Sequence, residues 1–306
     1  MKVGYAVLYE DGELVISKNH TLLQKKIIKD YGKFEDTNVP WGSDGLHIKI
    51  VQILDSIKSN CVKEWFEDCI NLTKLINFKN LDVSNCTNFS YMFTYCVSLQ
   101  NLNGLQNWDV SNGTYFKRMF NNCNLLQDLN GLQNWNVSNG KDFSSMFRNC
   151  GSLQDLNGLS NWNVSNGTDF FSMFNNCNSL QDLNELENWN VSKGTDFSGM
   201  FGFCRALQNL NGLENWNVSN GTDFSYMFNN CKSLENLNAL SNWNVSNGTK
   251  FNSMFAYCET LKKISLSNTL DILTKDIFYE CNPKLKIHWK NHIYTYEDLL
   301  QYEEIY

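Results

Sequence analysis

The chain has 306 residues and a formal net charge of −7, with 42% hydrophobic and 14% aromatic residues. This composition supplies enough apolar side chains for a folded core, so it excludes a chain that is disordered along its whole length. The acidic balance also argues against nucleic acid and anionic membranes as partners, because both are bound mainly through Lys and Arg.

The first residues do not resemble an export signal. The apolar run from Val3 to Tyr9 is short and is followed at once by Glu10 and Asp11, whereas a secretory signal needs a longer apolar segment and a cleavage site. No stretch approaches the roughly 18 apolar residues of a membrane helix. We therefore expect no membrane insertion, and a protein that stays in the cytoplasm or leaves by a non-classical or phage-borne route.

Residues 1–60 are predicted to form an N-terminal capping region. Residues 3–17 are expected to form a β-hairpin around the turn Glu10-Asp11-Gly12. Residues 21–33 are predicted to be helical and to end at Gly32, and the apolar segment 47–57 should lead into the first coil.

Residues 61–263 contain an internal repeat with a 27-residue step. A Met-Phe pair recurs once in each repeat, a Cys follows three places after the Phe, and a Trp recurs with the same 27-residue step. The Met-Phe pairs are Met92-Phe93, Met119-Phe120, Met146-Phe147, Met173-Phe174, Met200-Phe201, Met227-Phe228 and Met254-Phe255. Trp65-Phe66 and Cys69 extend the series by one coil towards the N-terminus. A fixed step of this length is typical of a solenoid, so we expect a stack of about seven to eight coils.

The spacing inside one coil predicts its local structure. Trp135 and Val137 alternate with polar residues, as on one face of an extended segment, and Ser138-Asn139-Gly140 marks a turn. Phe143, Met146, Phe147 and Cys150 then fall at helical spacing, and Asp142 is placed to cap that short helix. Leu153, Leu156 and Leu159 line a second extended stretch. The predicted fold class is an α/β-type solenoid of coils that each run strand, turn, short helix, strand.

Residues 264–306 are predicted to be a degenerate last repeat followed by a C-terminal cap. Phe278 and Cys281 continue their columns with a shortened 23-residue step, residues 287–294 suggest a hairpin, and a short helix should start at Thr295 with Asp298 in a capping box. Two Asn columns are expected to form amide ladders between coils. They are Asn130, Asn157, Asn184, Asn211 and Asn238, and Asn134, Asn161, Asn188, Asn215 and Asn242.

The repeat resembles the BspA-type leucine-rich repeat, and more closely its mycoplasma-lipoprotein-like subfamily with the motif WDVSN followed by MFxxC. Asn107-Trp108-Asp109-Val110-Ser111-Asn112 and Met119-Phe120-Asn121-Asn122-Cys123 carry the likeness, which extends over residues 65–281. The resemblance implies a right-handed solenoid, a cell-surface location, a role in adhesion and protein binding, and no catalytic residues. The chain departs from the usual motif at Gly113 and Gly140, where the subfamily has Val.

The cysteines and histidines do not indicate a metal or redox centre. The chain has no Cys-x-x-Cys, and neighbouring cysteines of the column should lie side by side without pointing at each other, so we expect buried free thiols. His288 and His292 have metal-ligand spacing but fall in the predicted hairpin. No catalytic or nucleotide-binding motif occurs. We expect no cofactor, and an enzyme would have to use the short N-terminal region.

An acidic strip is a first candidate site. Asp128, Asp155 and Asp182 keep the repeat step, and Asn101 and Asn209 fill the same slot in other coils. Stacked carboxylates repel one another, so a cationic partner or a calcium ion could use the strip, and the alternative is a solvated edge. A second row is better explained by capping of the predicted helices. That row is Asp142, Asp169, Asp196 and Asp223.

The outward positions of the predicted helices are a second candidate site. Comparing the coils with one another shows that departures from the repeat gather there as aromatic and basic residues, which are common in protein interfaces. They are Tyr91, Tyr95, Lys117, Arg118, Arg148, Phe171, Phe203, Tyr226 and Tyr257. Drift of solvent-exposed positions is the alternative explanation. The preferred function is a non-catalytic scaffold that binds a protein partner, with two alternatives: an adhesin for host matrix or glycan, and an enzyme within residues 1–60.

Overall fold

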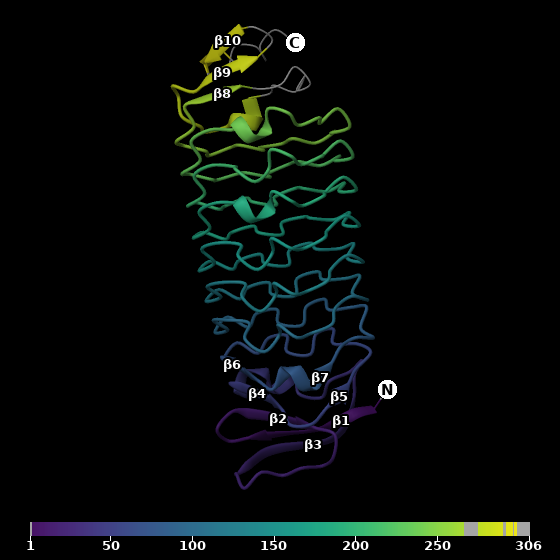
Figure 1. Ribbon diagram of the computed structural model, residues 1–306. Coiled ribbons are helices and arrows are strands. Elements are labelled where there is room, and N and C mark those ends of the chain that lie inside the picture. The colour runs from purple at the N-terminus through teal and green to yellow at the C-terminus, as the bar shows by residue number, and fades with distance from the viewer. Residues whose placement is uncertain (1, 266–274, 290–291, 296, 299–306) are drawn as a thin grey trace.

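The computed structural model describes residues 2–265, 275–289, 292–295 and 297–298. The chain winds into a tall stack of flat coils, with the N-terminal strands at one end and the C-terminal strands at the other (Figure 1). One continuous cluster of buried apolar side chains extends from Ala6 to Ile287. The chain is therefore a repeat solenoid with a single shared interior.

The N-terminal end is a five-stranded sheet with the order β3-β1-β2-β4-β6. The expected hairpin is formed by β1 (Lys2–Tyr9) and β2 (Glu13–Ser17), which pair antiparallel. The expected helix over residues 21–33 is wrong, because β3 (Ile27–Glu35) pairs antiparallel with β1 instead. Edge pairing overrides the helical spacing of the apolar residues in this segment.

The sheet passes directly into the repeats. A short 3₁₀ helix, η1 (Gly42–His47), precedes β4 (Ile50–Ile53), which pairs parallel with β2 on one side and with β6 (Lys74–Ile76) on the other. One turn further on, β5 (Ile57–Lys58) pairs with β7 (Leu81–Asp82), after the 3₁₀ helix η2 (Phe78–Asn80). The first coil is thus built onto the N-terminal sheet by parallel strand pairing.

The C-terminal end carries a second sheet with the order β10-β9-β8. The expected hairpin consists of β9 (Lys286–Trp289) and β10 (His292–Thr295), and β8 (Lys263–Ser265) pairs parallel with β9. Thr295 N–H donates to Asp298 Oδ2 over 2.6 Å, and Asp298 N–H donates to Thr295 Oγ1 over 3.2 Å, as in a capping box. The continuation of the predicted helix lies outside the described residues.

The degenerate last repeat is in place. Its 3₁₀ helix, η5 (Lys275–Phe278), supplies both contacts to the preceding coil. Phe255 N–H donates to Ile277 O over 2.9 Å, and the Phe278 ring stacks on the Phe255 ring with the centroids 5.6 Å apart. Two further 3₁₀ turns, η3 (Asn184–Leu186) and η4 (Asn238–Leu240), occupy equivalent positions in two coils. The shortened 23-residue step therefore keeps the register of the column.

The short helix expected in each coil is replaced by two consecutive β-turns, which a third turn-type hydrogen bond, from Arg148 N–H to Ser145 O over 3.2 Å, joins. Met146 N–H donates to Phe143 O, and Cys150 N–H donates to Phe147 O, both over 3.2 Å and across three residues. The N–H groups of Ser145, Phe147 and their equivalents point to the next coil, where Phe147 N–H donates to Met173 O over 2.9 Å. Every second N–H group is used within a turn and cannot bond to the next coil. Neighbouring central coils are therefore joined by isolated β-bridges and not by continuous β-strands.

The third residue of each of these two consecutive β-turns, Ser145 and Asn149 in one coil, has a left-handed backbone. In the first turn of each coil this column is Glu64, Tyr91, Arg118, Ser145, Ser172, Gly199, Tyr226 and Ser253. In the second turn the column is Asp68, Tyr95, Asn122, Asn149, Asn176, Phe203, Asn230 and Tyr257. Gly and Asn suit such positions, whereas most other side chains are strained there. We call these the first and second left-handed columns.

Aromatic columns fill the interior. Neighbouring Trp rings of the column from Trp108 to Trp243 stack at 6.2 to 6.4 Å. Trp135 Nε1–H donates to Leu105 O of the preceding coil over 3.0 Å, and Cys123 Sγ–H donates to Phe93 O over 3.3 Å. Each column thus adds a polar link between coils to the apolar contact.

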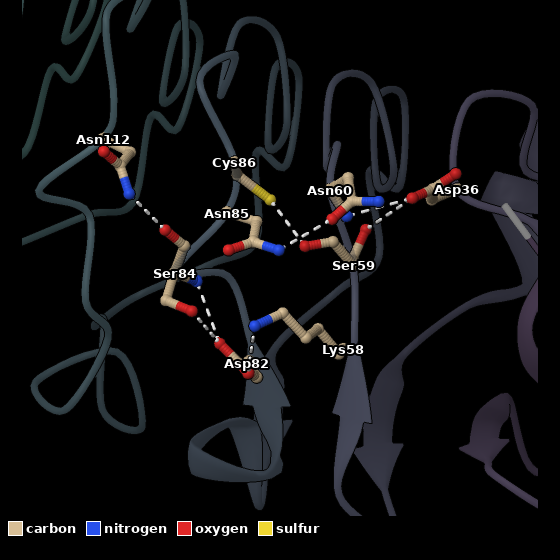
Figure 2. A network of polar contacts seen from close by, with 9 residues as sticks. All are labelled: Asp36, Lys58, Ser59, Asn60, Asp82, Ser84, Asn85, Cys86 and Asn112. Carbon is tan, nitrogen blue, oxygen red and sulfur yellow. Dashed lines mark hydrogen bonds and ion pairs between the residues drawn. The ribbon is translucent and has the colours of Figure 1, made fainter.

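The Asn ladders run through other residues than expected. Asn130, Asn134 and their equivalents are exposed. One set of linking amides belongs to the column that starts at Asn112, interrupted by Lys193, since Asn139 Nδ2–H donates to Ser111 O over 2.8 Å. A second set belongs to Asn149 and Asn176, whose amides donate to the Asn 27 residues earlier. Figure 2 shows where the Asn112 column begins: Asn112 bonds Ser84 O, Asn85 bonds Asn60, and Asn60 N–H donates to Asp36 Oδ2 over 3.0 Å. Asp36, just after β3, thus anchors the N-terminal region to the ladder.

Candidate functional site

All nine aromatic and basic candidates lie on the face formed by the paired β-turns, which we call the turn face. Tyr91, Arg118 and Tyr226 belong to the first left-handed column, and Tyr95, Phe203 and Tyr257 to the second. Lys117 and Phe171 directly precede the first column in their coils, and Arg148 directly precedes the second. A turn of four residues repeats at nearly the same spacing as a helix, so the candidates share one face although the helix is absent.

Five of these candidates line one groove on the turn face. The groove has a volume of about 750 Å³, and its lining residues come from six successive coils, including the degenerate last one. Its lining residues are Arg148, Phe171, Ser172, Asn175, Ser198, Gly199, Phe203, Asp223, Ser225, Tyr226, Asn229, Ser253, Tyr257 and Tyr279. The rings are partly open to solvent, with exposed fractions of 37% for Phe203 and 52% for Tyr226. The groove therefore combines apolar rings with hydroxyl and amide groups.

Gly199, which lines the groove, and its buried neighbour Gly202 were missed from the sequence. Gly199 stands in the first left-handed column, where the neighbouring coils have Ser172 and Tyr226. Gly202 stands where other coils have Asn175 or Asn229. The signal is visible in the sequence, because both glycines are departures from the repeat in which a side chain is lost.

The charges in the groove are unequally compensated. Asp223 Oδ2 lies 3.1 Å from Lys250 Nζ, so this carboxylate already has a cation. Arg148 has no ion-pair partner among the described residues, and its Nε is buried without a hydrogen-bond acceptor. The groove thus presents one uncompensated positive charge at its N-terminal end, which favours an anionic group on a ligand.

The other four candidates form a separate group near the N-terminal end of the turn face. The Arg118 guanidinium lies over the Tyr91 ring at 5.7 Å, and Tyr95 is 47% exposed. Lys117 is half-buried. None of the four lines the groove. The structure therefore divides the predicted surface into two patches.

The acidic strip lies apart from the groove and has a structural role. Asp128 and Asp155 each accept the backbone N–H of the second following residue through Oδ1 over 2.9 Å, and Asp182 does so over 3.2 Å. Asn209 makes the same bond to Asn211 N–H. Since Asn replaces Asp here, the slot requires a side-chain acceptor for the turn and not a charge.

The second acidic row does not cap helices. Asp142, Asp169, Asp196 and Asp223 form the column of parallel β-bridges between coils, and each accepts a backbone N–H two residues ahead. Burial, together with the neighbouring carboxylates of Asp142 and Asp196, raises the pKa of Asp169. The side chains of this row therefore stabilise turns, while their carboxylates repel one another between successive coils.

The cysteine column is buried and chemically quiet. All eleven cysteines are free thiols, and burial raises the pKa of Cys69, Cys86 and Cys204 to about 12. In the described ranges, no three His, Cys, Asp or Glu side chains are grouped so that they could share a metal ion. Within the same part of the chain, no helix has the length and apolar character needed to span a bilayer.

Comparisons with known proteins follow the repeat. The chain matches the family described as "Mycoplasma protein of unknown function, DUF285" over residues 60–185 and 181–283. A comparison with curated proteins gave no significant match.

Solved structures of bacterial proteins also align along the stack. A leucine-rich cell surface protein from Faecalibacterium prausnitzii is 12% identical, with 94% of each chain covered and a TM-score of 0.35. A leucine-rich repeat protein from Bacteroides ovatus is 13% identical, with 97% of this chain and 80% of that one covered and a TM-score of 0.38. One from Eubacterium ventriosum is 14% identical over 93% and 91%, with a TM-score of 0.30.

The family match spans most of the chain and coincides with the coils that carry the Trp-Asn-Val-Ser-Asn and Met-Phe-x-x-Cys motifs. It confirms the resemblance drawn from those motifs. The chain therefore belongs to the family described as "Mycoplasma protein of unknown function, DUF285", as a BspA-type leucine-rich repeat protein.

Proposed function

We propose that this protein is a non-catalytic recognition scaffold that binds a protein partner through the groove on its turn face. One observation carries the proposal: nine aromatic and basic departures from the repeat lie on this face, and five of them line one groove. Solvated positions that drift independently have no reason to gather there. Exposed rings around a polar floor, with Arg at one end, are also the side chains that protein interfaces favour.

The backbone conformation supports the same conclusion. Phe203 occupies a left-handed position at φ 63°, where the two neighbouring coils have Asn, and Tyr226 occupies one at φ 59°, where the preceding coil has Gly199. A residue other than Gly, Asn or Asp costs on the order of 1–2 kcal/mol in this conformation. Residues that fold less well than those in the neighbouring coils, and that expose aromatic rings, are best explained by a role in binding.

The resemblance to surface repeats extends the proposal to location. A scaffold of this family would present the groove outside the cell, and the partner would then be an extracellular or host protein. Protease treatment of intact cells tests this point. Digestion of the chain without lysis supports a surface location, and full protection until lysis contradicts it.

Affinity capture with three matched chains tests the proposed function. The intact chain, a groove variant (Phe203→Asn with Tyr226→Ser) and a strip variant (Asp128→Asn, Asp155→Asn and Asp182→Asn) are immobilised in parallel. Every substitution introduces a residue that another coil has in the same slot, so the stack should be retained, and circular dichroism checks this. A captured protein is identified, purified and titrated against each chain.

The proposal predicts that the purified partner binds the intact chain and the strip variant alike. The groove variant should bind it at least about tenfold more weakly, because it lacks two exposed rings. Equal binding to all three chains would contradict the assignment of the groove. Binding of a purified glycan, with no protein ligand, would move the assignment to the adhesin alternative.

A further inference from the structure

The sequence contains nine Asn-Gly pairs, which fall into two turns of the repeat. Such a pair is prone to deamidation, because Gly has no Cβ to shield its backbone nitrogen from the Asn side chain. Five pairs lie in the turn after a Trp or its equivalent: Asn112-Gly113, Asn139-Gly140, Asn166-Gly167, Asn220-Gly221 and Asn247-Gly248. Four lie in the turn before it: Asn103-Gly104, Asn130-Gly131, Asn157-Gly158 and Asn211-Gly212. Reaction in the folded chain depends on what holds the Gly N–H and the Asn amide.

The fold holds both groups in the turn after the Trp. Gly140 N–H donates to Val137 O over 2.8 Å, and Asn139 Nδ2–H donates to Ser111 O of the preceding coil over 2.8 Å. The other four pairs of this turn make the same two hydrogen bonds. Deamidation at any of the five would have to break both bonds first.

The four pairs before the Trp share one local sequence and one turn. Each lies in a Leu-Asn-Gly-Leu segment with an exposed Asn. Leu159 N–H donates to Leu156 O over 3.0 Å, and Gly158 has φ 107°, as in a type II turn. A Cβ at Gly158 would lie 2.4 Å from Leu129 O, so the turn requires Gly in this coil.

One of these four pairs lacks a hydrogen bond that the other three have. Gln106, Gln133 and Glu214 stand two residues after the Gly, and their side chains accept its N–H over 2.7, 2.6 and 2.7 Å. The fourth coil has Ser160 in this place, and Gly158 N–H has no hydrogen-bond acceptor among the described residues. The nitrogen must lose its proton before it can attack, so an acceptor for that proton protects the other three pairs.

We propose that Asn157 is a site of spontaneous deamidation in the folded protein, and that the missing side-chain acceptor at Ser160 makes it so. The deprotonated Gly158 nitrogen attacks Asn157 Cγ, the bond from Cγ to the amide nitrogen breaks, and ammonia leaves with the proton. A five-membered succinimide results. Water then opens this ring at either carbonyl carbon and leaves aspartate or isoaspartate. The inference does not depend on the proposed binding function.

Deamidation at this position adds a carboxylate to the acidic strip. Asp155 Oδ1 accepts the Asn157 N–H over 2.9 Å, so the new carboxylate stands two residues away from an existing one. Isoaspartate also adds one carbon to the backbone of the turn. Both products therefore differ from the intact chain in charge, and ion exchange can separate them.

The purified full-length chain tests the inference when it is kept folded in mildly alkaline buffer, in water labelled in its oxygen. The label enters only when a succinimide is hydrolysed during the incubation, so peptide mass spectrometry excludes events from the digestion. Ser160→Gln and Gln133→Ser are reciprocal variants, and each introduces a residue that another coil has in that place. Circular dichroism checks that both fold. The same chain unfolded in urea gives the reactivity of each pair without the fold.

In urea the four Leu-Asn-Gly-Leu segments should react alike, because their local sequence is identical. In the folded chain Asn157 should react about fivefold or more faster than the other three, which is the factor that one net hydrogen bond provides. Ser160→Gln should lower the rate at Asn157 to that of Asn130. Gln133→Ser should raise the rate at Asn130 to that of Asn157. This exchange would exclude a cause elsewhere in the coil.

Equal rates at the four pairs of the folded chain would overturn the inference. A folded Ser160→Gln chain in which Asn157 reacts as before would do the same. So would an unreactive Asn157 under conditions in which the unfolded chain reacts, because the turn alone would then protect the pair. If Ser160→Gln does not fold, Gln133→Ser decides alone, and an unchanged rate at Asn130 contradicts the proposal.

Discussion

Asn176 Nδ2–H donates a hydrogen bond to Asn149 Oδ1 over 2.9 Å, linking two coils through the second left-handed column. Asn149 in turn donates to Asn122 Oδ1 over 2.7 Å. Asn is favoured here twice, because it tolerates a positive φ better than most residues and because its amide can both donate and accept. The same side chain therefore shapes the turn and joins the coils.

Replacing Asn149 should separate these two contributions. Asn149→Gly keeps the left-handed turn but removes two amide hydrogen bonds, so we expect a loss of about 1–2 kcal/mol in the free energy of unfolding. Asn149→Ala removes the same bonds and adds the left-handed penalty, for a further loss of about 1 kcal/mol. Urea titrations of the three chains measure both differences. An Ala variant as stable as the Gly variant would contradict the left-handed assignment.

The Trp column should depend on its hydrogen bonds as well as its rings. Trp162 Nε1–H donates to the buried Leu132 O over 3.0 Å. Trp162→Phe keeps a ring but leaves that carbonyl without its donor and a gap beside it, so we expect a loss of about 2–4 kcal/mol. Thermal and urea unfolding measure the loss. Tyr115→Phe, at a ring that is 48% exposed, is the control and should change stability little.

The thiols should be protected by the stack. Ten of the eleven cysteines are buried, and Cys61 is half-buried. Burial raises the pKa of the interior thiols, as at Cys123 and Cys177. Since thiolates are the reactive species, we expect a thiol reagent to modify Cys61 first and the rest only upon unfolding. Counting modified sites by mass spectrometry, with and without denaturant, checks this. Fast modification of several native thiols would be incompatible with a closed interior.

Stability should respond to the charge of Asp169. Its pKa is raised by burial and by the carboxylates of Asp142 and Asp196, so the folded chain binds this proton more tightly than the unfolded chain does. The ionised carboxylate therefore costs stability above the folded pKa, and that cost disappears as the pH falls towards the ordinary value of about 3.9.

Asp169→Asn keeps an acceptor for the Phe171 N–H and removes the charge. We expect it to raise the urea midpoint at neutral pH, with a gain that shrinks as the solution is acidified. Asp128→Asn, in a slot that other coils fill with Asn, is the matched control. A gain for Asp169→Asn that grows at low pH would have the wrong sign for a raised pKa.

The repeat made the stack predictable, but not the path of the backbone inside a coil. Residues 27 apart in the sequence, such as Trp135 and Trp162, stay in contact if every coil has the same geometry. Apolar residues at Phe143, Met146 and Phe147 fit both a helix and two consecutive turns, because eight residues are too few to separate periods of 3.6 and 4. The right-handed course of the coils stays a prediction of the resemblance.

The ends were harder to predict, because tertiary pairing decided them. Residues 21–33 show helical spacing, yet β3 completes the edge of a sheet whose other strands come from the hairpin and the first coil. The capping-box pair Thr295 and Asp298 was readable from sequence, because that motif is local.

The candidate site was predictable as a face but not as a groove. Aromatic departures such as Phe203 and Tyr226 are visible in the aligned coils. Which of them share a groove depends on how the turns place Arg148, Phe171 and Gly199 along one face. The acidic strip resembled a site because its Asp residues keep the repeat step, but Asp128 forms a turn through its side chain, as Asn209 does in another coil.

The central claim is that the coils from Trp65 to Phe278 form one stack with a shared interior. Hydrogen–deuterium exchange, resolved to single coils by mass spectrometry, tests it most directly. The amides of Phe120, Phe147 and Phe174 each donate to the next coil over 2.9 Å, so they should be strongly protected and should exchange together through one cooperative opening. Weak protection, or rates that differ by orders of magnitude between neighbouring central coils, would contradict a continuous stack.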